Sequence, residues 1–203
     1  MLHIETIEPA TLELLKKIQS IPEFQGTRLV GGTALALQIG HRQSIDLDFF
    51  SIVPYDTTTL VQLLSELGNI IVLQDSPAIH IFLINGVKVD FVDFKFPWRQ
   101  EPLEEDGVRL AQLEDIAAMK VTAAIGRGTK KDFIDIATLL QIYTLKQILD
   151  FYQSKYPNSS LFMATKSLLY FDDAEKDAMP RMFSNLTWEE TKQMITSAVE
   201  KYS

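Results

Sequence analysis

The sequence predicts an α+β fold in which a mixed sheet with flanking helices is followed by an α-helical region. Through Phe94, segments rich in β-branched and aromatic residues alternate with segments of helical periodicity. After a connection over residues 97–107, every further segment has the pattern of a helix. We therefore expect an α/β domain at residues 1–105 and a helical domain at residues 106–203.

The first region contains three predicted helices and five predicted strands. Pro9 suits the first position of a helix, Asp56 suits an N-cap, and Gly40 and Gly68 suit helix ends. Asn85-Gly86 is the strongest short-range signal for a hairpin. The helices are expected at residues 9–20, 33–39 and 57–67, and the strands at residues 28–30, 45–50, 70–73, 79–84 and 87–94.

The second region is predicted to be helical throughout. Thr187 and Glu190 form a capping box at the start of the last helix. The helices are expected at residues 110–127, 131–142, 145–156, 160–170 and 187–202.

Composition narrows the class of protein. The chain has 203 residues and no cysteine, which excludes disulfides, thiol catalysis and cysteine-type zinc sites. The net charge of −8 argues against broad coating of nucleic acid, although one local basic patch remains compatible with a polynucleotide. We expect a cytosolic protein, because the sequence begins without a secretory pattern and contains no apolar run long enough for a membrane span.

Two acids on one predicted strand carry most of the chemical information. Residues two apart on a strand point to the same face, so Asp46 and Asp48 project together while Leu47 and Phe49 turn to the core. Neighbouring carboxylates repel each other, and a cation relieves the repulsion. Oxygen ligands of this kind predict Mg²⁺ or Mn²⁺.

A third acid is expected on a later strand. Asp90 is our candidate for a further metal ligand that also orients or deprotonates an attacking hydroxyl. Asp93 is its rival, because Asp90 and Asp93 lie on opposite faces of the strand and the sequence does not fix strand register.

The glycine pair before the second helix suits a phosphate. Gly31 and Gly32 allow close approach to the main chain, and the helix start offers N–H groups. Thr33 would cap that helix or donate its hydroxyl to a phosphate oxygen. An NTP would then extend from the glycine turn to metals at Asp46 and Asp48.

Three motifs together resemble the AbiEii/AbiGii toxin family of polymerase-β-type nucleotidyltransferases. They read GGTALAL at residues 31–37, HRQSIDLDFF at residues 41–50 and RGTKKDFIDI at residues 127–136. The resemblance implies metal ligation by Asp46, Asp48 and Asp90 and phosphate contacts from Gly32 and Thr33. It places Arg42 and Ser44 in the nucleotide-binding motif, and it implies that Lys120, Arg127, Lys131 and Asp135 complete the active site from the helical domain.

The spacing of the helical residues gives partly independent support. Lys120 and Arg127 lie on one face of a predicted helix, where two cations suit the charge of a triphosphate. Lys131 and Asp135 are one turn apart, so an intrahelical salt bridge is an equal alternative. Asp132 also fits a plain role in the first turn of its helix.

The expected activity is transfer of a nucleotide from an NTP to an acceptor hydroxyl, with release of pyrophosphate. By resemblance, the acceptor is RNA, particularly tRNA, and the protein is a toxin that has a cognate antitoxin as partner. A protein or small-molecule acceptor is the alternative that the negative net charge favours. A catalytically silent nucleotide-binding module is a third interpretation.

Overall fold

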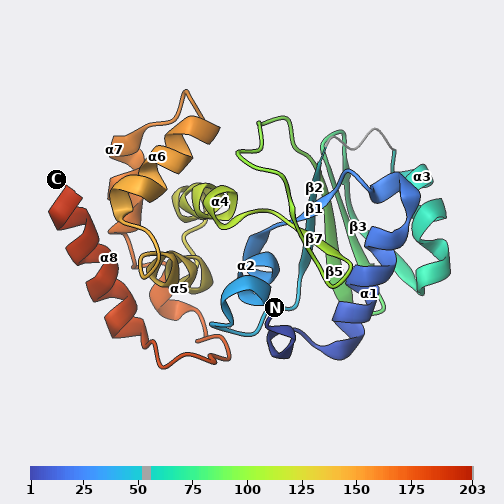
Figure 1. Cartoon of the computed structure of the whole chain (residues 1–203), viewed down its shortest axis with the longest axis horizontal. Helices are drawn as coiled ribbons and strands as arrows, with labels where there is room; N and C mark the ends of the chain where they lie inside the picture. Colours follow the sequence, from blue (N-terminus) through green and yellow to red (C-terminus); the bar gives the residue numbers. More distant parts are fainter. Residues whose placement is uncertain (52–55, 203) are drawn as a thin grey trace. The chain divides into compact units, whose positions relative to one another are not determined.

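The chain divides into two compact units (Figure 1). The computed structural model describes residues 1–51 and 56–202. Unit 1 comprises residues 1–95 and 101–111, and unit 2 comprises residues 96–100 and the chain from Gln112 onward. Within the described residues, no helix is long and apolar enough to cross a membrane.

Unit 1 is built on a seven-stranded mixed sheet. The strand order is β3-β4-β5-β2-β1-β7-β6, in which β2 pairs with β5 and β1 with β7 in parallel, and the other neighbours are antiparallel. The strands are β1 (Arg28–Leu29), β2 (Leu47–Ser51), β3 (Ile70–Ser76), β4 (Ile79–Ile84), β5 (Val87–Asp93), β6 (Leu103–Glu105) and β7 (Val108–Leu110).

The helices of unit 1 lie close to the predicted ranges, although the second begins at Gly31 and not at residue 33. α1 (Pro9–Ser20) has proline at its start, and α2 (Gly31–Ile39) ends at Gly40 with a left-handed φ of 77°. α3 (Thr57–Leu64) is capped by Asp56, which accepts a hydrogen bond from the Thr59 N–H. A short 3₁₀ helix at Ser65–Leu67 completes the segment that was expected to be helical over residues 57–67.

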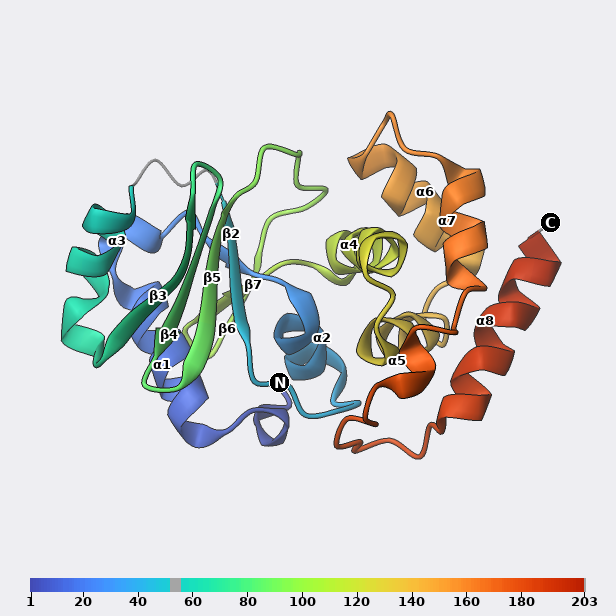
Figure 2. The same cartoon turned by 180° about the vertical axis from the view of Figure 1, so that it is seen from behind.

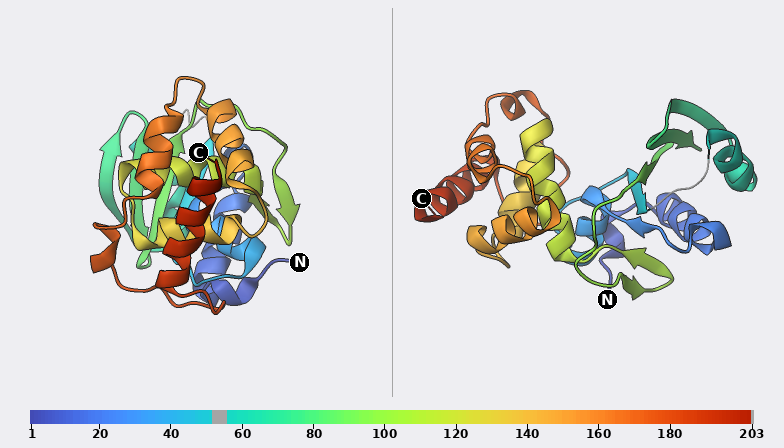
Figure 3. Two further views of the ribbon diagram at one scale, coloured as in Figure 1. Left: turned by 90° about the vertical axis from the view of Figure 1, so that its left-hand side faces the viewer. Right: turned by 90° about the horizontal axis from the view of Figure 1, so that it is seen from above.

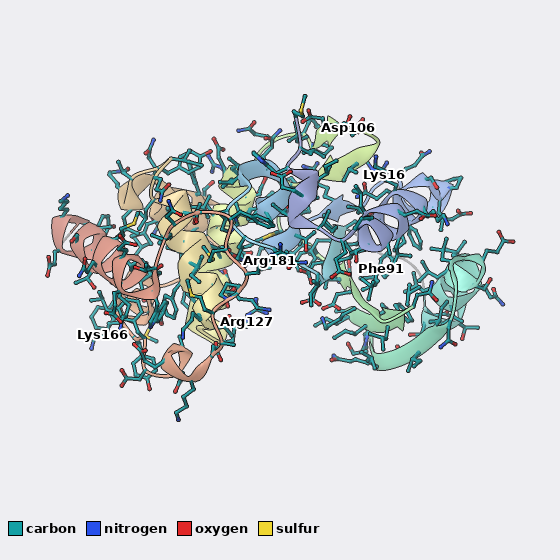
Figure 4. The ribbon with its side chains drawn as sticks, turned by 90° about the horizontal axis from the view of Figure 1, so that it is seen from below. Lys16, Phe91, Asp106, Arg127, Lys166 and Arg181 are labelled. Carbon is teal, nitrogen blue, oxygen red and sulfur yellow. The ribbon has the colours of Figure 1, made fainter. Side chains whose placement is uncertain are left out.

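One face of the sheet carries an aromatic core. Phe49 and Phe91 are fully buried and stack with ring centroids 5.3 Å apart. Phe24 packs on Phe91 at 4.8 Å, and Phe82 meets the same ring edge-on (Figure 4 labels Phe91). Thr57 of α3 bonds His80 on this same face. The opposite face of β2 and β5 is therefore the one left for polar side chains.

Unit 2 is helical, as expected. Its helices are α4 (Leu113–Gly126), α5 (Lys130–Leu139), α6 (Leu145–Lys155), α7 (Leu161–Leu168) and α8 (Trp188–Tyr202) (Figure 3, left). Thr187 and Glu190 form the predicted capping box, since the side chain of each bonds the main-chain N–H of the other.

The hairpin β6–β7 corrects two expectations. The sequence predicts no strand after residue 97 and a helix from residue 110, whereas β6 and β7 pair from Leu103 to Leu110 and α4 begins at Leu113. Asp106 and Gly107 form the turn, with φ of 53° and 77°. This hairpin adds to the sheet through the β1–β7 pair, so the expected boundary at residue 105 falls inside unit 1.

Candidate active site

Asp48 and Asp90 are neighbours on adjacent parallel strands. The register of β2 and β5 pairs Leu47 with Val89, Asp48 with Asp90, and Phe49 with Phe91. Leu47, Val89 and both phenylalanines are fully buried, so the two acids share the opposite face of the sheet. Their Cα atoms are therefore about 5 Å apart, the usual spacing of neighbouring strands.

The register also separates Asp90 from its rival. Asp93 pairs with Ser51 and lies, like Phe91, on the other face of β5. Lys95 lies 3.2 Å from the Asp93 carboxylate. Of the two candidate acids on this strand, Asp90 is thus the one that shares the face of Asp48.

Asp46 lies just before β2 and not within it. The strand was expected over residues 45–50, but it begins at Leu47. The preceding main chain bonds elsewhere: the Ser44 N–H donates to the Thr6 carbonyl at 2.9 Å, and Thr33 Oγ1 donates to the Asp46 carbonyl. Asp46 is half-buried at the entry to the strand.

Lys88 is a neighbour of this site that the sequence does not single out. Its Nζ lies 2.5 Å from both carboxylate oxygens of Asp90. The side chain of Lys88 is 39% exposed and that of Asp90 14% exposed, so the pair lies at the surface of the sheet. Among residues 1–51 and 56–202, no three acidic or histidine side chains form a ready-made metal cage.

The glycine turn lies directly against Asp48. Gly31 has a φ of 68°, which favours glycine, and a Cβ at this position would overlap Asp48 Oδ2. A Cβ at Gly32 would overlap Nη2 of Arg42, whose side chain is buried. The first main-chain groups of α2 therefore lie on the same face of β2 as Asp48.

Thr33, Arg42 and Ser44 all have structural contacts here. The predicted cap does not form, because α2 begins at Gly31 with no side-chain cap and Thr33 Oγ1 bonds Asp46 instead. Thr33 is 1% exposed, and its Oγ1 lies 2.9 Å from Ser44 Oγ. Arg42 Nη1 donates to the Gln43 carbonyl. These contacts fix the segment that leads into the acid-bearing strand.

In unit 2, Lys120 belongs to a buried ion-pair cluster. Its Nζ lies 2.6 Å from Asp135 Oδ2 and 3.2 Å from Asp132 Oδ1, and the side chains of both acids are fully buried. Arg127 Nε donates to Asp132 Oδ2 at 2.8 Å while its side chain stays 65% exposed (Figure 4). Lys120 and Arg127 therefore lie close together, and both pair with Asp132.

Asp132 makes more contacts than an acid whose role is limited to the first turn of a helix. It accepts hydrogen bonds from Thr129 Oγ1 and Arg127, and it completes a capping box at the start of α5. Asp135 pairs with Lys120 of α4, whereas Lys131 has an exposed side chain. The cluster thus joins α4 to α5.

The acid stability of unit 2 is expected to depend on Asp132. Burial alone would raise the pKa of this carboxyl, but Arg127 and Lys120 outweigh burial and lower the pKa from 3.8 to about 2. A depressed pKa stabilises the fold above pH 4, and this contribution is lost as the pH falls towards 2. It is worth about 2 kcal/mol. Urea unfolding from pH 6 to pH 2 should therefore show a steeper loss for the wild type than for Asp132→Asn. Parallel pH curves for the two proteins would contradict this assignment.

Comparisons with known proteins agree with this architecture. The family model described as "Nucleotidyl transferase AbiEii toxin, Type IV TA system" matches residues 13–202. An uncharacterized protein of Aquifex aeolicus is 33% identical over 196 residues, which cover 94% of each chain.

Two solved structures share the fold. A putative nucleotidyltransferase from H. pylori has a TM-score of 0.60 at 20% identity, over 96% of this chain and 95% of that one. MenT4, a nucleotidyltransferase toxin from Mycobacterium tuberculosis, has a TM-score of 0.54 at 10% identity, over 95% and 86% of the two chains.

Proposed function

Because this chain belongs to the AbiEii family of nucleotidyl transferase toxins, we propose that it transfers a nucleotide from an NTP to a hydroxyl of RNA, with tRNA as the foremost acceptor. The observation that carries the proposal is the register pair Asp48–Asp90, in which Asp48 lies against the glycine turn at the start of α2. One oxygen of the acceptor attacks the α-phosphorus, the bond between the α- and β-phosphates breaks, and pyrophosphate leaves. The hydroxyl proton passes to a base at the site.

The acids fit a hard divalent cation. Mg²⁺ is usually held by one or two carboxylates together with substrate phosphates and water, so Asp48 and Asp90 suffice without a closed protein cage. We assign Asp46, at the entry to β2, as a further ligand. Mg²⁺ or Mn²⁺ at this site would neutralise charge on the triphosphate and lower the pKa of the acceptor hydroxyl. Without a bound metal, the ammonium group of Lys88 neutralises the Asp90 carboxylate.

The glycine turn supplies the phosphate-binding groups in this proposal. The N–H groups of the first turn of α2 have no partner within the helix and attract anions together with the helix dipole. Gly31 and Gly32 keep that end free of Cβ atoms beside Asp48 and Arg42. Thr33, Ser44 and Arg42 then serve by holding the turn and the segment before β2 in place.

The helical residues divide into two groups. We assign Lys120 and Asp135 a positioning role, because both are buried and paired with each other. Arg127 and Lys131 are the exposed cations of the matched motif, and we assign them to phosphate-bearing ligands. The type IV toxin–antitoxin description of the family supports a cognate antitoxin as functional partner.

The test is transfer of label from each α-³²P-NTP, with Mg²⁺, to total tRNA, followed by denaturing gels that resolve RNA and protein. We expect label on RNA, lost by at least about a hundredfold in Asp46→Ala because one charge-stabilising group is missing. The variant should unfold at the wild-type temperature. Label on protein, or on an aminoglycoside added in place of tRNA, would replace the acceptor assignment. Normal transfer by folded Asp46→Ala would overturn the metal assignment.

A further inference from the structure

The face of the sheet that carries Asp90 and Lys88 continues onto apolar residues of β4 and β3. On β4, Ile81 pairs with Asp90 and Leu83 pairs with Lys88. On β3, Ile71 pairs in turn with Leu83. Cross-strand partners share a face, so Ile81, Leu83 and Ile71 lie on the face of Asp90. We call these three residues the apolar strip.

The apolar strip is open in part to solvent. Ile71 is 48% exposed, and Ile81 and Leu83 are half-buried, whereas their neighbours Phe82 and Ile84 on the other face are fully buried. β3 forms one end of the sheet, and β3, β4 and β5 run side by side in Figure 2 and in the right panel of Figure 3. Large apolar side chains next to a polar site at a surface mark a binding surface.

We propose that the apolar strip seats the terminal nucleoside of the RNA acceptor, an inference that rests on the proposed function. An acceptor whose hydroxyl reaches Asp90 has its adjoining part over Ile81, about 5 Å away on the next strand. Ile71 lies one strand further, so the strip extends roughly 10 Å from β5, the scale of a nucleoside and its neighbour. A base and ribose offer the flat, weakly polar faces that aliphatic side chains pack against.

The charges beside the strip favour RNA over a polycation. The strip itself is uncharged, and Lys88 borders it at Leu83. The acid of β3, Asp75, bonds Thr57 and lies 3.3 Å from His80, which places it on the face of Phe82. A polyamine-like acceptor such as an aminoglycoside needs carboxylates along its length, but the acid next to the strip, Asp90, is already paired with Lys88.

Ile71 and Val72 provide a matched pair of variants. They are adjacent in sequence and similarly exposed, at 48% and 45%, but Val72 pairs with Phe82 and so belongs to the other face. We expect Ile71→Asp to lower kcat/KM for tRNA by about tenfold or more through repulsion of phosphate. Ile71→Lys keeps an aliphatic stem for packing and adds a cation, so it should equal or exceed the wild type. Val72→Asp should stay within about twofold. The Kd for NTP should be the same in all four proteins.

Each outcome bears on the proposal. A loss confined to Ile71→Asp, with NTP binding intact, supports the apolar strip as the acceptor seat. Equal activity of Ile71→Asp and Val72→Asp on tRNA overturns this inference and leaves the proposed function standing. Wild-type label on protein or on an aminoglycoside instead of tRNA also overturns it, while nucleotidyl transfer stands. If the wild type labels none of these acceptors, the proposed function fails first and the inference fails with it.

Discussion

Asp48→Asn is expected to reduce nucleotidyl transfer by at least about a hundredfold to a thousandfold while the protein stays folded. Asparagine keeps the shape of the side chain but removes the charge that faces Asp90 in the register of β2 and β5. The main-chain bond from the Val30 N–H to the Asp48 carbonyl does not involve the carboxylate. Loss of one acid also relieves repulsion from Asp90, and thermal unfolding checks that the variant stays folded.

Asp93→Asn is the matched control for this experiment. Asp93 lies on β5, three residues after Asp90, but on the opposite face of the sheet. Its removal should change the rate of transfer by less than about threefold, because its carboxylate pairs with Lys95 away from the face of Asp48. Steady-state transfer with saturating NTP and tRNA, together with thermal unfolding, separates catalysis from stability. If Asp93→Asn were the inactive variant and Asp48→Asn the active one, the catalytic face would be misassigned.

Local turn chemistry made the sheet of unit 1 largely predictable. Asn85 and Gly86 adopt φ of 50° and 85°, the left-handed values that this pair tolerates, and β4 and β5 flank them as expected. Asp106-Gly107 carries the same signal with φ of 53° and 77°. Its strands have three residues each, too short for a period-two pattern to stand out, so the hairpin escaped prediction.

Those parts of the candidate site that depend on the side-chain pattern of a single strand were predictable from the sequence. Alternation along a strand is enough to turn Asp48 away from a core of Leu47 and Phe49. The choice between Asp90 and Asp93 needs the pairing of β2 with β5, which brings together residues 42 apart in sequence and is set by tertiary packing. The sequence did not indicate Lys88 as a site residue for the same reason, since an isolated lysine on a strand is typical of a solvated face.

The helical cations show a different limit. Helical spacing predicts Lys120 and Arg127 on one side of a helix, but it does not predict what packs there; Arg127 itself follows the last residue of α4. The structure puts Asp132 and Asp135 of α5 against that face and buries Lys120 between them. A lysine predicted to meet a triphosphate thus pairs with two acids of its own unit, because charged residues enter a core only when paired.

Lys155→Met is expected to destabilise the protein by about 3–5 kcal/mol, because it leaves the buried carboxylate of Asp115 without its cation. Both side chains are fully buried, with Lys155 Nζ 2.5 Å from Asp115 Oδ1. The same ammonium donates to the Pro97 carbonyl and lies 4.5 Å from the centre of the Trp98 ring. This lysine therefore ties residues 96–100 to α4 and α6, which explains why that segment belongs to unit 2.

A second lysine on α6 gives the control that isolates burial as the cause. Lys146 pairs with Asp150 at 2.7 Å, but these side chains are 71% and 57% exposed, so Lys146→Met should cost less than about 1 kcal/mol. Adding Asp115→Asn to Lys155→Met removes the orphaned charge while its amide oxygen still accepts from the Arg99 N–H. Urea unfolding of the double variant should therefore recover about half of the loss or more. If Lys155→Met and Lys146→Met lowered the free energy of unfolding equally, the two ion pairs would contribute alike. Burial would then not explain the effect of Lys155→Met.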